Sequence, residues 1–145
     1  MKIVTKLLVA GLMFAGGVAI AAEATDPQVK ARQELMDAIG GGMKVLGGMA
    51  EGKAAYDAAA AEAAKAAIVT AAGEITAKFE PQAVDPKSTA KAEVWTNWDD
   101  FVAKGNDLST AAGAWDVSSP ETIGAGMGAV GGACKACHTA YRAAS

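Results

Sequence analysis

The sequence predicts an all-α protein, an antiparallel four-helix bundle whose helices run up, down, up and down. Four segments carry apolar residues at alternating spacings of three and four, which is the period of a helix with one buried face. None of these segments shows the strict alternation of apolar and polar residues that is typical of a strand. Mostly short connections separate the segments, and helices of similar length joined in this way pack as antiparallel neighbours.

The first predicted helix covers residues 27–52, and the run Thr25-Asp26-Pro27-Gln28 marks its start. This run fits either a capping box or an Asp cap followed by Pro at the first helical position. Three consecutive glycines at residues 40–42 lie inside the helix, where each costs about 1 kcal/mol relative to alanine. They indicate either an interrupted helix or a close approach to the backbone. The second predicted helix, residues 54–79, is rich in alanine and ends before Pro81.

The third predicted helix covers residues 89–114, and its aromatic residues are expected to pack in the core and around a binding site. A turn at residues 117–121 follows, in which Ser118 and Glu121 have the spacing of a capping box. The last predicted helix runs from this turn to Tyr141.

Residues 1–22 have the layout of a secretory signal peptide. Two lysines precede an apolar run, and small residues spaced as a cleavage site follow it. The apolar run is shorter than the ~20 residues of a membrane-spanning helix, which disfavours an uncleaved anchor. We expect cleavage near Ala21 or Ala22, which leaves residues 23–145 as one folded domain in the periplasm.

The charge pattern argues against nucleic acid as a partner. The formal net charge is −3 at pH 7, and removing the two lysines of the leader makes the domain still more negative. No run of basic residues offers the electrostatic footprint that phosphate backbones require. An acidic domain is also poorly attracted to an anionic membrane surface. The sequence therefore predicts neither nucleic-acid binding nor a stable membrane anchor.

The motif Cys134-Lys135-Ala136-Cys137-His138 carries the chemistry that we expect of this chain. Cys-x-x-Cys-His is the signature of c-type haem attachment. Helix positions three apart lie on nearly the same face, so both thiols can reach one edge of a porphyrin. His138 is the only histidine of the chain, and it would be the proximal axial ligand of the iron. We predict one covalently attached haem c per chain.

Other uses of the cysteines fit the sequence less well. A disulfide between residues three apart closes a loop too short for a structural staple. A zinc site would need further Cys or His ligands, and the chain contains none. A thioredoxin-like pair would open a helix of an α/β fold. Thiol or peroxide chemistry would also need a base or a second redox group, so we do not expect an enzyme.

The chain after the leader resembles the class II c-type cytochromes, the cytochrome c′ family, whose haem motif lies near the C-terminus of a four-helix bundle. The resemblance implies a single-haem electron carrier of the periplasm that exchanges electrons with other redox proteins. It rests on the C-terminal block and on shorter blocks in the first helix, the first turn and the third helix: residues 131–142, 32–36, 51–57 and 93–95.

The resemblance also implies roles for single residues. Cys134 and Cys137 match the thioether cysteines, and His138 matches the proximal ligand. Met36 matches the residue on the opposite face of the haem. In cytochromes c′ proper that residue blocks the sixth position without binding iron, whereas in low-spin relatives a methionine binds it. The neighbourhood of Met36 resembles the low-spin relatives slightly better, which favours electron transfer. The alternative is a five-coordinate haem that binds nitric oxide or carbon monoxide.

By the same resemblance, Arg32 and Gln33 lie near the haem propionates and Arg142 lies beside His138. Arg32 interrupts the apolar stripe of the first helix, where a permanent charge is costly unless it is paired. A propionate is one credible partner for Arg32, because no acidic residue occupies the neighbouring positions of the stripe. The other interpretation is that the guanidinium reaches solvent near the helix start.

A homodimer is a further expectation. Members of the family commonly pair through their first two helices. The alanine-rich second predicted helix offers small residues beyond its core stripe, and small residues allow two helices to approach closely.

Overall fold

A computed structural model describes residues 23–144, so the predicted signal peptide and its cleavage site lie outside the described residues. The described chain is helical apart from its connections. It forms four long helices and one short helix: α1 (Pro27–Ala50), α2 (Ala58–Phe79), α3 (Glu93–Thr96), α4 (Trp98–Gly113) and α5 (Pro120–Tyr141).

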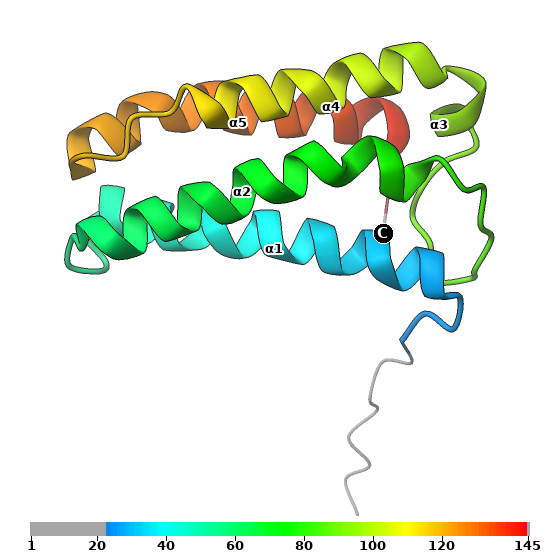
Figure 1. The fold of residues 1–145 in the computed structure, drawn as a ribbon, viewed down its shortest axis with the longest axis horizontal. Helices are drawn as coiled ribbons and strands as arrows, with labels where there is room; N and C mark the ends of the chain where they lie inside the picture. Colours follow the sequence, from blue (N-terminus) through cyan, green and yellow to red (C-terminus); the bar gives the residue numbers. More distant parts are fainter. Residues whose placement is uncertain (1–22, 145) are drawn as a thin grey trace, which may run out of the picture.

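The four long helices form a closed ring of neighbours. Along the chain, α1 packs on α2, α2 on α4 and α4 on α5, and α5 returns to α1. Figure 1 shows two layers, with α1 and α2 in one and α4 and α5 in the other. The α1–α2 and α4–α5 connections lie at one end of the bundle, and the α2–α3 connection lies at the other. This arrangement confirms the predicted up-down-up-down four-helix bundle.

Helix α1 begins with the predicted Asp cap rather than a capping box. The Asp26 carboxylate accepts hydrogen bonds from two backbone N–H groups of the first turn, at 2.8 and 3.1 Å, and Pro27 follows it. The helix continues through its glycine run, so the interrupted-helix interpretation is wrong. At Gly42 a Cβ atom would lie 2.6 Å from Ile68 Cγ1 and 2.8 Å from the Ala64 carbonyl, which shows how closely α1 and α2 approach.

Two predicted helices have different limits in the structure. Helix α2 starts later than predicted because the Asp57 side chain caps it, accepting a hydrogen bond from the Ala60 N–H at 2.7 Å. The third predicted helix is broken at Asn97, which has φ −118° and ψ 45° and separates α3 from α4. The break accompanies a bond across the bundle, in which Trp95 Nε1 donates to the Phe79 carbonyl at 2.7 Å.

The predicted capping box of the last helix is wrong by one residue. Ser119 rather than Ser118 is the N-cap, and its partner is Thr122 rather than Glu121. The Thr122 N–H donates to Ser119 Oγ at 3.2 Å, and the Ser119 N–H donates to Thr122 Oγ1 at 3.0 Å. Ser118 belongs to the preceding turn instead, because its N–H donates to the Asp116 carboxylate at 2.9 Å.

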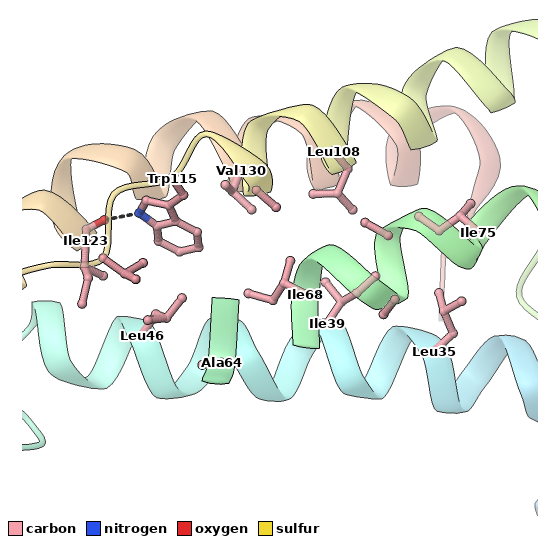
Figure 2. Packing of buried hydrophobic residues seen from close by; sticks show 14 of the residues in the cluster. Leu35, Ile39, Leu46, Ala64, Ile68, Ile75, Leu108, Trp115, Ile123 and Val130 are labelled. Atoms are coloured by element: carbon pink, nitrogen blue, oxygen red, sulfur yellow. Dashed lines mark hydrogen bonds between the residues drawn. The ribbon is translucent and has the colours of Figure 1, made fainter. Parts of the chain in front are cut away.

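One hydrophobic core fills the centre of the bundle, with residues from every long helix. Figure 2 shows Leu46 of α1, Ile68 of α2 and Ile123 of α5 pointing between the layers. Trp115 closes this part of the core, and its Nε1 donates to the Ile123 carbonyl at 3.0 Å. Within residues 23–144, no helix combines the length and apolar character that a membrane crossing requires.

Candidate functional site

A groove of about 510 Å³ lies at the end of the bundle where α1 begins and α5 ends. This volume is within the range of ~300–1,000 Å³ that is common for cofactor sites. Its walls come from all five helices and from the connection between α2 and α3. Every residue singled out from the sequence as a haem or iron contact lines it: Arg32, Gln33, Met36, Cys134, Cys137, His138 and Arg142.

The haem motif lies in the last two turns of α5. Cys134 and Cys137 are partly buried and both are free thiols. Burial raises the pKa of each thiol, so both stay protonated at neutral pH and lack the low pKa of a redox-active pair. The pKa of His138 is lowered, first by its burial and then by the charge of Arg142. Its imidazole is therefore neutral at pH 7, which is the form that binds iron.

Arg32 lies inside the protein, with only 3% of its surface exposed. Its Nε donates to the Lys78 carbonyl at 3.1 Å and its Nη2 donates to the Pro81 carbonyl. The guanidinium carbon lies 5.1 Å from the ring centroid of Phe79 and 5.2 Å from that of Trp95, close enough for cation–π attraction. The interpretation that Arg32 reaches solvent is wrong, because these carbonyls and rings hold it inside the bundle.

The lining of the groove fits an apolar group that carries negative charges. Arg32 Nη1 is buried and has no hydrogen-bond partner among the described residues. Lys87, Lys104 and Arg142 also line the groove, whereas Asp37 is its one acidic lining residue. A groove with a basic lining in a domain of negative net charge suits the two propionates of a haem.

The connection between α2 and α3 forms one wall of the groove and is fixed at two places. Gln33 Nε2 donates to the Lys87 carbonyl at 3.2 Å, which ties this wall to α1. The buried Asp85 carboxylate accepts the N–H groups of Thr25 at 2.8 Å, Asp26 at 3.0 Å and Lys87 at 2.7 Å. These backbone hydrogen bonds lower the pKa of Asp85 to about 2.

A cluster beside the motif was missed in the sequence. The buried Tyr141 hydroxyl donates to Asp100 Oδ2, and Lys104 Nζ lies 3.3 Å from Asp100 Oδ1. This hydrogen bond is the main cause of the lowered pKa of Asp100, and it raises the pKa of Tyr141 to about 12. Tyr141 could have been predicted from the sequence as a residue of the site, because it follows His138 by three positions and lies on the same face of the helix. Asp100 and Lys104 lie on α4, and no pattern connects them to the motif.

The family model described as Cytochrome C' matches residues 27–142. The chain belongs to the cytochrome c′ family. It is 42% identical over 119 residues to a cytochrome c-556 of Agrobacterium tumefaciens (strain apple 185), covering 77% of this chain and 91% of the relative.

Solved structures agree with this cytochrome c′ membership. Oxidized cytochrome c556 of R. palustris has a TM-score of 0.75 at 28% identity and covers 82% of this chain and 98% of its own. A nitric oxide complex of a cytochrome c prime variant from Alcaligenes xylosoxidans has a TM-score of 0.71 at 27% identity, with coverages of 81% and 94%. The protein is a cytochrome with covalently bound haem c, which the two cysteines near its C-terminus fit.

In this cytochrome c′ fold, Met36 lies both at the edge of the core and at the groove. Its side chain is partly buried and packs against the core, and it also lines the groove that holds His138. The thioether is therefore a candidate for the sixth iron position and not only a core residue.

Proposed function

We propose that this cytochrome carries single electrons in the periplasm, with His138 and Met36 as the two axial ligands of its iron. Cys134 and Cys137 attach the haem through thioether bonds. The observation that carries the proposal is that the Met36 side chain lines the same groove as the haem motif. The bound haem supplies the one-electron couple of its iron, and the chain supplies the ligands and their surroundings.

The chemistry of a thioether suits an electron carrier. Methionine sulfur is a soft ligand that favours ferrous iron and raises the reduction potential. A methionine that stays bound in both oxidation states also occupies the position that a gas would need. The hydrogen bonds from Arg32 to the Lys78 carbonyl and from Gln33 to the Lys87 carbonyl fix the groove wall. Little of the protein therefore has to rearrange when an electron arrives.

The remaining expectations belong to this proposal. Residues 1–22 direct the chain to the periplasm, where other redox proteins give and accept its electrons. The protein acts as a carrier and not as an enzyme. The small residues on the exposed side of α2 support a homodimer through α1 and α2.

A second function is favoured by two specific observations. The solved structure of the cytochrome c prime variant from Alcaligenes xylosoxidans is that of its nitric oxide complex. In this chain, Gly40 lies one turn after Met36 on the groove lining, and a Cβ atom there would meet no atom of the described residues within 4 Å. If Met36 shields the iron without binding it, this open side of the groove suits a protein that captures nitric oxide or carbon monoxide.

Optical spectra of the purified holoprotein distinguish the two functions. Bound Met36 gives a low-spin ferric haem with a sulfur-to-iron charge-transfer band, and Met36→Ala abolishes that band. Met43→Ala is the matched control, because Met43 lines the same groove two turns further along α1 and should leave the band intact. A high-spin ferric spectrum of the wild type at neutral pH, with rapid carbon monoxide binding after reduction, would establish the gas-binding function instead.

A further inference from the structure

The Asp100 carboxylate lies outside the groove lining and is held from two sides by residues that line the groove. Tyr141 of α5 donates its hydroxyl to one oxygen, and Lys104 of α4 approaches the other to 3.3 Å. Tyr141 and Lys104 line the groove together with Cys137. The ion pair therefore lies beside the place where the haem is attached.

The two charges of this pair act on the groove with opposite sign. Lys104 itself lines the groove together with Cys137, whereas Asp100 lies outside the groove lining. Their exposures differ: the Lys104 side chain is 27% exposed and the Asp100 side chain is 56% exposed. Solvent screens an exposed charge more strongly than a half-buried one, so the effect of Lys104 inside the groove is the larger.

We propose that the Lys104–Asp100 ion pair, oriented by the Tyr141 hydroxyl, sets the reduction potential of the bound haem. Lys104 raises the potential and Asp100 lowers it, with a net upward effect. The inference rests on the proposed haem site but not on the identity of the sixth ligand.

The physical reason is electrostatic. One electron taken from a partner lowers the charge of the haem site by one, and a nearby cation stabilises the reduced form relative to the oxidised form. A nearby carboxylate has the opposite effect. Tyr141 is a positioning residue in this arrangement. Its hydroxyl partly compensates the charge of Asp100 and keeps the carboxylate beside Lys104.

The test is a spectroelectrochemical titration of the holoprotein at constant ionic strength. Lys104→Gln should lower the midpoint potential, and Asp100→Asn should raise it. The double variant should lie between the two single variants and below the wild type, because the larger effect of Lys104 is lost together with that of Asp100. Tyr141→Phe keeps the ring and removes only the hydroxyl, so it should shift the potential in the direction of Lys104→Gln but by less.

Two controls separate this effect from a general loss of charge or stability. Asp99→Asn and Lys44→Gln remove exposed charges outside the groove lining and should leave the potential close to that of the wild type. Thermal unfolding of every variant reports a structural role, which would lower stability but would not shift the potential in opposite directions.

The outcomes distinguish the two proposals. If haem stays attached and the Lys104 and Asp100 variants leave the potential unchanged or shift it in the same direction, this inference is wrong and the haem site stands. If the wild type carries no covalent haem, the proposed attachment through Cys134 and Cys137 is overturned, and the inference falls with it.

Discussion

The two ends of the bundle are built from the same four helices but are filled in different ways. At the end that holds the α1–α2 and α4–α5 connections, the protein fills its own interior. Trp115 bonds to the Ile123 carbonyl, and Tyr56 donates its hydroxyl to the Val117 carbonyl at 3.0 Å. Gly126 leaves room for the Trp115 ring, since a Cβ atom there would overlap it. We call this the closed end.

At the groove end, the helices leave a space that no side chain of the described residues fills. Basic side chains line it, and within residues 23–144 one nitrogen of the buried Arg32 has no hydrogen-bond partner. A well-packed interior normally avoids both features. The protein therefore packs the closed end with its own side chains, whereas the lining of the groove end suits a group that is not part of the polypeptide.

The largest effect is expected from removing both attachment cysteines. The double variant Cys134→Ala, Cys137→Ala should lose covalent haem entirely and should become much less stable at the groove end. Haem staining after denaturing electrophoresis measures attachment, and hydrogen exchange of α1 and α2 shows which end loses protection. Release of haem from the wild type by acid–acetone would contradict the covalent attachment.

The closed end can be destabilised by a substitution at a residue that does not line the groove. Gly126→Ala places a methyl group against the Trp115 ring, and overpacking of this kind costs about 1–3 kcal/mol. Gly128→Ala is the matched control on the same helix, because its Cβ would meet nothing within 4 Å. The control should gain up to about 1 kcal/mol from helix propensity. Urea unfolding measures both free energies. Equal stability of the two variants would show that Trp115 does not fill this end tightly.

A smaller effect, which changes with pH, is expected at the groove wall. The pKa of Asp85 is about 2 in the folded protein, below its ordinary value of 3.8. A lowered carboxyl pKa contributes stability that is fully present above pH 3.8 and is lost as the pH falls through 2. Asp85→Asn should therefore lower stability at pH 7 and flatten its decline between about pH 4 and 2. An unchanged acid profile, measured by thermal unfolding against pH, would contradict the role of this carboxylate.

The fold was predictable because its signals are periodic and local. Apolar residues at alternating spacings of three and four predict the four helices. The Asp26 cap can be predicted from the residues beside it. The break at Asn97 was not predictable, because the apolar stripe continues through it and the hydrogen bond that accompanies it joins Trp95 to the Phe79 carbonyl on another helix. The capping box failed because only Ser118 has a glutamate three residues later. In the structure the Ser118 N–H bonds to Asp116, and Ser119 forms the box with Thr122, which the sequence pattern does not indicate.

The candidate site was predictable only in part. The haem motif is contiguous, and the family resemblance supplied Met36 and Arg32, which the structure brings to the same groove. The surroundings of Arg32 are two carbonyl oxygens and two rings from other segments, which no local pattern shows. Asp100 was missed for the same reason, because its role depends on the packing of α4 against α5.

Both ends of the described chain lie at the groove end, and this has a practical consequence for electrochemistry. The Asp85 carboxylate holds the backbone of Thr25, and Ala143 donates its N–H to the Thr89 carbonyl at 2.8 Å. Figure 1 shows the start of α1 and the end of α5 on this side of the bundle. A short tether at either end of the described chain would therefore orient the groove toward an electrode. Immobilisation would then favour direct electron exchange without an added mediator.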